Sequence, residues 1–167
     1  IVSKQTNRFF PSATLNGEIT PEYLGVGYII GPKIAGVLVA GGVLAWLGIM
    51  GSPMAGHLIK GGHQVFLYSI PSVPPALVEA GGKACANGRE VAQKSDIVIT
   101  MVPDTPHVEA ALFADNGIVQ GLSKGKMVVD MSSISPLATK EFAQKIKALG
   151  CEYLDAPVSG GEVGAKA

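Results

Sequence analysis

The strongest indication of the fold comes from the stretch DIVITMV at Asp96–Val102. Its apolar residues form a nearly continuous run and do not alternate with polar ones, which is typical of a strand covered on both faces of a parallel sheet. A second run of the same kind, KMVVDM at Lys126–Met131, follows after a helix-like segment. Two such strands separated by a helix predict a βαβ crossover.

Strand-like and helix-like segments alternate on both sides of these runs. Further strands are predicted at Val43–Leu47, Gln64–Ser69, Lys83–Ala86 and Glu152–Val158. Helices are predicted at 49–61, 73–80, 88–94, 105–114 and 136–149, the last capped by Ser135, opened by Pro136 and ended by Gly150. This repeated alternation predicts an α/β fold, a Rossmann-like doubly wound parallel sheet, with ligands at the carboxyl ends of the strands.

The composition of the chain changes near residue 43. Residues 1–42 read as an atypical N-terminal extension, a polar coil followed by an apolar segment, and 43–167 as the Rossmann-like domain. Charged residues make up 16% of the 167 residues, against about 25% in typical soluble domains. Lys plus Arg and Asp plus Glu number 13 each, so no nucleic-acid partner is expected. The spacing of the histidines and cysteines indicates no metal site.

A glycine turn follows the first predicted strand. A dinucleotide fingerprint reads G-x-G-x-x-G, and Gly48 and Gly51 occupy its second and third positions, whereas Trp46 stands at the first. In such a turn the second glycine lets the backbone approach the pyrophosphate. We therefore predict cofactor binding by Leu47, Gly48, Ile49, Met50 and Gly51. A packing motif in a glycine-rich apolar stretch is the alternative interpretation.

The run from Trp46 to His63 resembles the signature of the β-hydroxyacid dehydrogenase family, from which it departs at Trp46 and at His57. This resemblance implies that NAD or NADP is the cofactor. An acidic residue after the second strand would favour NAD and an arginine NADP. Tyr68–Pro71 holds neither, although Ser69 could bond a ribose hydroxyl, so the choice stays open.

Two further loops resemble family motifs. Met101, Val102 and Pro103 match a loop that passes over the nicotinamide side of the cofactor in that family. Ser132 lies in a D-x-S-S motif, and the resemblance implies that it lies near the nicotinamide and the substrate. A proline-containing turn and a serine-rich helix cap are the alternative interpretations of these two loops.

The most specific match is DAPVSGG at Asp155–Gly161, which has no mismatch to the substrate-binding motif of the family. Ser159, Gly160 and Gly161 would offer a hydroxyl and consecutive backbone amides to a carboxylate. Neighbouring strings resemble the tartronate semialdehyde (2-hydroxy-3-oxopropionate) reductase branch. The resemblance covers roughly three quarters of the chain and implies a small hydroxyacid or semialdehyde substrate, reduced by hydride transfer.

The catalytic residue of the family is a lysine in a helix beyond the cofactor domain, and an all-helical second domain follows. The chain stops at Ala167, before both, so we assign no catalytic residue. A general acid is then missing. We expect little or no reductase activity from these 167 residues, which an assay with tartronate semialdehyde and NADH or NADPH would check.

The front of the chain does not match that family. Residues 24–48 resemble a membrane segment of oligopeptide-transporter-family proteins, and the two resemblances meet at Trp46–Gly48. The alternative function is therefore a non-catalytic chimeric remnant that joins a transporter-like segment to a nucleotide-binding domain. Residues 24–47 are marginal for a membrane span, which needs about 20 apolar residues. We expect a cytoplasmic protein; the sequence leaves open whether it forms a homo-oligomer.

Overall fold

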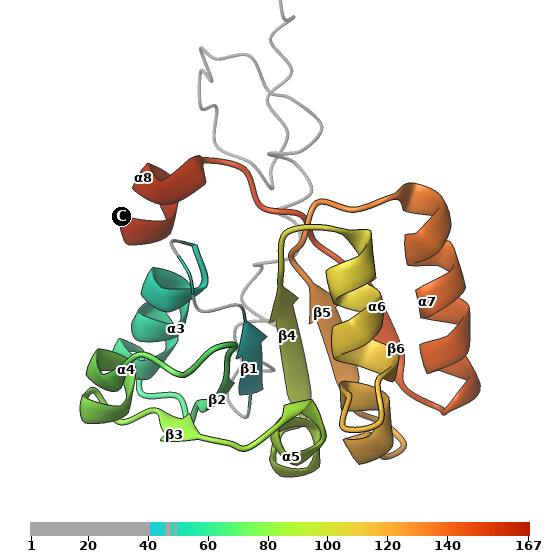
Figure 1. Ribbon diagram of the computed structural model, residues 1–167, viewed down its shortest axis with the longest axis horizontal. Helices are drawn as coiled ribbons and strands as arrows, with labels where there is room; N and C mark the ends of the chain where they lie inside the picture. Colours follow the sequence, from blue (N-terminus) through green and yellow to red (C-terminus); the bar gives the residue numbers. More distant parts are fainter. Residues whose placement is uncertain (1–40, 46–47, 49) are drawn as a thin grey trace, which may run out of the picture.

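The computed structural model describes residues 41–45, 48 and 50–167 (Figure 1). Its strands are β1 (Gly41–Ala45), β2 (Phe66–Tyr68), β3 (Lys83–Ala84), β4 (Ile97–Met101), β5 (Met127–Asp130) and β6 (Glu152–Asp155). Its helices are α3 (Gly51–Lys60), α4 (Pro75–Glu79), α5 (Gly88–Lys94), α6 (Thr105–Phe113), α7 (Pro136–Ala148) and α8 (Gly161–Lys166), with a 3₁₀ turn, η2, at Ile118–Gly121.

The described strands form one parallel sheet in the order β3-β2-β1-β4-β5-β6. This is the order of a dinucleotide-binding fold, in which the chain returns to the middle of the sheet after the third strand. The predicted doubly wound parallel sheet is therefore confirmed. The strand order reverses between β1 and β4, which is where such sheets bind ligands.

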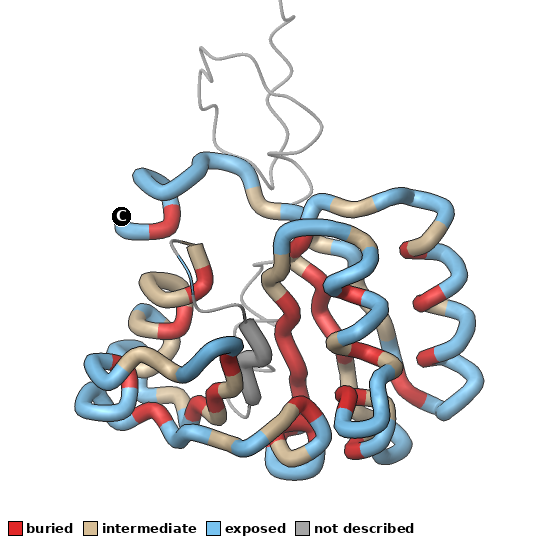
Figure 2. Tube along the Cα trace, in the orientation of Figure 1, coloured by how far each residue is buried: buried red, intermediate tan, exposed pale blue. Residues whose placement is uncertain are grey.

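Helices cover both faces of the sheet. One core cluster joins α5, α6, η2 and α7 to residues such as Val98 of β4 and Val128 of β5. The other joins α3 and α4 to Ile97 and Ile99 of β4 and Val129 of β5. Figure 2 shows the buried residues running along β4 between these layers. Consecutive β4 residues thus face opposite cores, which explains why its sequence is apolar throughout.

The described first strand, Gly41–Ala45, includes Gly41 and Gly42 ahead of the predicted start at Val43, while residues 46–47 of the prediction lie outside the described part. Its register with β4 pairs Gly41 with Ile97 and Ala45 with Met101. The partner strand therefore decides its length, although glycine is a poor strand former. The proposed domain boundary at 42/43 falls inside β1, and because residues 1–40 lie outside the described part, that division stays a prediction.

The last predicted strand was too long. β6 ends at Asp155 and not at Val158, and its ladder continues only through the Ala156 N–H, which donates to the Asp130 carbonyl at 2.8 Å. Pro157 has no N–H to extend the ladder. The chain instead turns into α8, which the sequence reading missed along with η2; both are too short to show a helical period.

Ser135 stands at the predicted N-cap of α7, but its side chain forms no capping hydrogen bond. Its N–H donates to Thr105 Oγ1 at 3.1 Å, and its carbonyl accepts from Thr139 Oγ1 at 3.1 Å. The prediction that the Ser135 side chain caps α7 was therefore wrong. The contacts of Ser135 are instead made by its backbone N–H and carbonyl, which bond to neighbouring threonine side chains. At α5, by contrast, the N-cap side chain does bond: Asn87 Oδ1 accepts from the Glu90 N–H at 2.9 Å.

Lys126 stabilises the C-terminal end of α5 from a distant part of the chain. Its Nζ donates to the carbonyls of Ala92 and Gln93, the latter at 3.0 Å. A cation at this end also interacts favourably with the helix dipole. We expect Lys126→Met to lower the free energy of unfolding by about 1 kcal/mol in urea titrations. Lys140→Met, on the exposed side of α7, should change it little.

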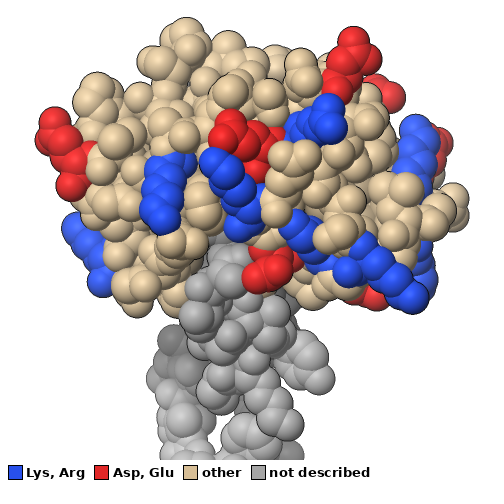
Figure 3. Space-filling model, turned by 90° about the horizontal axis from the view of Figure 1, so that it is seen from below, with Lys and Arg blue, Asp and Glu red and all other residues tan. Residues whose placement is uncertain are grey.

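Charges on the described surface are mixed in sign. Figure 3 shows Lys and Arg interspersed with Asp and Glu on the face seen from below. Within residues 41–45, 48 and 50–167, no helix combines the length and apolarity that a membrane span requires. In the same part of the chain, no three His, Cys, Asp or Glu residues come together as a metal-ligand group.

Candidate functional site

The loops that leave the strands at their carboxyl ends lie at one edge of the sheet (Figure 1). At this edge the chain turns from β4 into α6, from β5 into α7 and from β6 into α8. They meet there because all the described strands run in the same direction. The motifs that the sequence places after separate strands are thereby brought to one side of the molecule.

The glycine turn leads into the N-terminus of α3. Gly51 is buried and is the first residue of that helix, and the Ser52 N–H donates to the Gly48 carbonyl at 3.2 Å. Met50, at the N-cap, forms no side-chain capping bond. A helix N-terminus after a glycine turn is suited to a phosphate group. Trp46, Leu47 and Ile49 lie outside the described residues.

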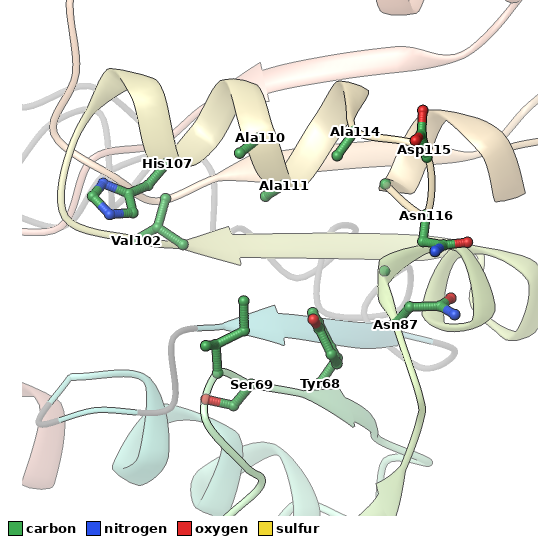
Figure 4. Close-up of a pocket in the computed structure, with 13 residues that line it drawn as sticks. Tyr68, Ser69, Asn87, Val102, His107, Ala110, Ala111, Ala114, Asp115 and Asn116 are labelled. Carbon is green, nitrogen blue, oxygen red and sulfur yellow. The ribbon is translucent and has the colours of Figure 1, made fainter.

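A cavity of about 620 Å³ opens between β2 and α6 (Figure 4). This volume lies within the range of small-molecule and cofactor sites, roughly 300–1,000 Å³. The lining residues come from the end of β2, the start of α5, α6 and the segment after it: Tyr68, Ser69, Ile70, Asn87, Gly88, Val102, His107, Ala110, Ala111, Ala114, Asp115, Asn116 and Gly117.

The cavity has an apolar wall and a polar end. Ala110, Ala111 and Ala114 of α6 face Tyr68 and Ser69 of the β2 side in Figure 4, and small alanine side chains leave room between the two. Asn87, Asp115 and Asn116 lie at the far end from Val102. Such a slot fits a planar heterocycle with hydrogen-bonding edges, such as adenine.

Two predicted cofactor residues, Ser69 and Val102, line this cavity. Met101 and Pro103 do not line it, nor do the predicted substrate residues Ser132 and Ser159–Gly161. The sequence reading missed the wall that α6 contributes. The only trace of it in the sequence is the alanines at 110, 111 and 114, which share one side of a helix.

At the N-terminus of α6, Asp104 caps the helix and contacts His107. The Asp104 carboxylate accepts from the His107 N–H at 3.4 Å and also contacts the His107 ring at Nδ1. The ring hydrogen bond holds the pKa of the Asp104 carboxyl below its usual value. Asp104 is therefore the N-cap residue of α6.

A buried carboxylate at the carboxyl end of β5 joins side chains of the two neighbouring strands, β4 and β6. Asp130 is fully buried and accepts from Thr100 Oγ1 at 2.8 Å, from Tyr153 OH at 2.9 Å and from the Ser132 N–H at 3.1 Å. Thr100 and Ser132 are also buried. We call these four residues the Asp130 network. Ser132 Oγ accepts from the Val102 N–H at 3.0 Å, so the network reaches the cavity wall.

Two groups beside Asp130 have shifted pKa values. Burial, followed by the nearby Asp130 carboxylate, raises the pKa of the Tyr153 phenol well above its usual value. Tyr153 therefore stays protonated and donates at neutral pH. Burial and the charge of Asp130 also raise the pKa of Asp155. Both shifts are those expected where negative charge is held away from water.

The predicted substrate motif is an exposed bend. Ser159, Gly160 and Gly161 are exposed, and Gly160 and Gly161 adopt φ values of +115° and +58°. Two successive left-handed residues favour glycine and leave the neighbouring amides on one concave side. Helix α8 starts at Gly161 and contacts α3, which starts at Gly51. The cofactor turn and the substrate motif therefore lie on the same side of the molecule.

Comparison with protein families and known proteins gives consistent matches. A family model described as the NAD-binding domain of 6-phosphogluconate dehydrogenase matches residues 44–167. The 2-hydroxy-3-oxopropionate reductase of Escherichia coli (strain K12) is 52% identical over 120 residues, 72% of this chain and 41% of that protein. The mitochondrial 3-hydroxyisobutyrate dehydrogenase of Mus musculus is 41% identical over 116 residues, covering 69% of this chain and 35% of that protein.

A solved structure shows the same arrangement. The 3-hydroxyisobutyrate dehydrogenase of Salmonella typhimurium superposes with a TM-score of 0.69 at 31% identity, covering 76% of this chain and 45% of that one. The chain thus spans less than half the length of these relatives. These matches give no support to the chimeric alternative, and the transporter-like residues 24–48 lie mostly outside the described part of the chain.

Proposed function

The chain is an NAD-binding domain of the β-hydroxyacid dehydrogenases and belongs to the family of the NAD-binding domain of 6-phosphogluconate dehydrogenase, from which we propose how it holds its cofactor. The adenosine half of the dinucleotide occupies the cavity between β2 and α6. The pyrophosphate binds at the glycine turn before α3, and the nicotinamide lies towards the loop that contains Met101, Val102 and Pro103.

The cavity is the single observation that carries this proposal. It lies beside the point where the strand order reverses, and its apolar alanine wall with polar groups at one end suits adenine. The absence of a Cβ at Gly48 lets a phosphate approach the backbone before α3. Ser69, buried at the end of β2, is placed to meet a ribose hydroxyl.

For the whole enzyme, we propose reduction of 2-hydroxy-3-oxopropionate or a similar small β-hydroxyacid semialdehyde. The support is the similarity to a protein named for that reaction. A bound nicotinamide supplies the hydride. Ser159, Gly160 and Gly161 would bind the substrate carboxylate through a hydroxyl and backbone amides, while Ser132 would lie near the reacting carbonyl. A cytoplasmic location and assembly into a homo-oligomer stay predictions.

Isothermal titration of the 167-residue chain tests the cofactor assignment. We expect NADH, ADP-ribose and AMP all to bind, because all three carry the adenosine that the cavity accommodates. AMP should compete with NADH for one site. Failure of NADH and AMP to bind would refute the assignment, whereas binding without competition would move the adenosine site elsewhere.

Preference for NADH over NADPH is a further expected result. No Lys or Arg lines the cavity, and Ile70, 68% exposed, stands beside Ser69 where an arginine would meet a 2′-phosphate. We expect NADH to bind about tenfold more tightly than NADPH, a difference of roughly 1.4 kcal/mol. Ile70→Arg should narrow that gap, and Val78→Arg, exposed on α4, should leave it unchanged. Equal affinities in the native chain would contradict this prediction.

A further inference from the structure

The Asp130 carboxylate occupies a position where the sheet would accept an apolar side chain. Val128, two residues earlier on the same face of β5, packs in the core cluster beside Phe142. Asp130 is fully buried, and the three hydrogen bonds that it accepts come from neutral groups. A carboxylate is costly to bury unless its oxygens are hydrogen-bonded, and three donors are gathered around this one. Its presence at the carboxyl edge points to a role beyond packing.

The network turns the backbone after β5. The last ladder bond of this strand runs from the Met131 N–H to the Thr100 carbonyl at 2.8 Å. The next N–H, that of Ser132, donates to the Asp130 side chain in place of a neighbouring strand. This local bond is the kind by which aspartate reshapes a chain end. It directs the Ser132 hydroxyl towards β4, where Ser132 Oγ meets Val102.

The bond from Ser132 to Val102 governs the loop after β4. Pro103 has no N–H, so the Val102 N–H is the last backbone donor before Asp104. That donor is held by Ser132 Oγ at 3.0 Å. Val102 itself lines the cavity. A path of two hydrogen bonds therefore connects the buried carboxylate to the end of the cavity that lies away from Asn87, Asp115 and Asn116.

We propose that Asp130 is a positioning residue for the cofactor loop. Through Ser132 it holds Val102 and Pro103 against the nicotinamide end of the dinucleotide, without touching the ligand. Tyr153 and Thr100 hold the carboxylate in place but lie off the path to Val102. This inference rests on the cofactor arrangement proposed above. It names Asp130 as the residue that fixes the position of the loop at the nicotinamide end.

Three variants separate positioning from general stability. Ser132→Ala removes the hydroxyl that accepts from the Val102 N–H. Asp130→Asn replaces the carboxylate at the start of the path by an amide of nearly the same shape. Tyr153→Phe removes another donor to Asp130 that takes no part in the path. Hydrogen exchange at the Val102 amide should speed up about tenfold in the first two and stay unchanged in Tyr153→Phe, because only the first two change the Ser132 hydroxyl or the carboxylate that positions it.

Ligand affinity supplies the second readout. NADH carries the nicotinamide ring that ADP-ribose lacks, so the ratio of their dissociation constants isolates the contact between the loop and that ring. We expect Ser132→Ala and Asp130→Asn to weaken NADH about tenfold while ADP-ribose changes less than twofold. Tyr153→Phe should leave the ratio unchanged and lower only the unfolding free energy. Should Asp130→Asn fail to fold, Ser132→Ala carries the test.

The outcomes distinguish this inference from the proposed function. An unchanged ratio and unchanged Val102 exchange in Ser132→Ala, with native affinity for both ligands, would overturn the positioning role alone. Equal weakening of both ligands in all three variants would also overturn it, because a purely structural role predicts that pattern. A native chain that binds neither ligand would refute the cofactor arrangement and the positioning role together.

Discussion

Replacing Gly121 by alanine is expected to lower the free energy of unfolding by about 3 kcal/mol, at the upper end of the usual range for overpacking. Gly121 ends η2, which packs against α5. A Cβ at this position would lie 2.1 Å from the Arg89 carbonyl oxygen and 3.0 Å from the Ala92 Cβ. The first obstacle is backbone of a helix, so no side-chain rotation can relieve it. Urea denaturation followed by circular dichroism measures the change.

Gly56→Ala is the matched control. Gly56 lies inside α3, and the nearest atom to an added Cβ is Leu77 Cδ2 at 3.8 Å, an ordinary contact. Alanine is the better helix former, so this change should raise the unfolding free energy by about 0.5–1 kcal/mol. Opposite signs for the two glycines are the expected result. A stable Gly121→Ala protein would mean that η2 and α5 are not packed as described.

Replacing Ala110 by tryptophan is expected to weaken dinucleotide binding by about a hundredfold, roughly 2.7 kcal/mol. Ala110 lies on the α6 wall of the cavity, opposite the β2 side that carries Tyr68 (Figure 4). The residue is exposed, so the larger side chain can be accommodated without disturbing the core. An indole there would project into the slot that we assign to adenine. Titration with NADH and with AMP measures the loss for both ligands.

Glu109→Trp provides the comparison. Glu109 is the preceding residue of α6, exposed and outside the cavity lining, and successive residues point about 100° apart around a helix. The same bulk at this position should leave NADH and AMP affinity within about twofold of the native value. Native affinity in Ala110→Trp, with both variants folded, would place the adenosine site outside this cavity.

The regular elements of the domain were largely predictable because their causes are local. The run DIVITMV predicted β4, observed at Ile97–Met101, and α5 was observed at Gly88–Lys94 as predicted. Buried parallel strands must be apolar on both faces, and helix ends need capping residues and glycines within a few positions. Gly150, at φ +74° after α7, is one such stop signal. Such residues can therefore be recognised in a short stretch of sequence.

The cavity could be predicted only in part. Ser69 and Val102 were identified because they follow strands, and strand ends converge in a parallel sheet. The α6 wall was missed because alanines in a helix also occur for reasons of helix propensity alone. Whether Ala110, Ala111 and Ala114 face a core, solvent or a ligand depends on how the helix is rotated against the sheet. Local pattern does not specify that rotation.

The Asp130 network shows most clearly where local information ends. From the chain alone one can derive a parallel sheet, glycine bends after its strands and a polar motif beginning at Asp130, because each follows from residues next to one another. That Asp130 meets Thr100, 30 residues away, and Tyr153, 23 residues away, follows from the order in which β4, β5 and β6 lie side by side. Strand order and helix rotation are set by long-range packing, and so the partners of a buried group emerge only when the sheet is assembled.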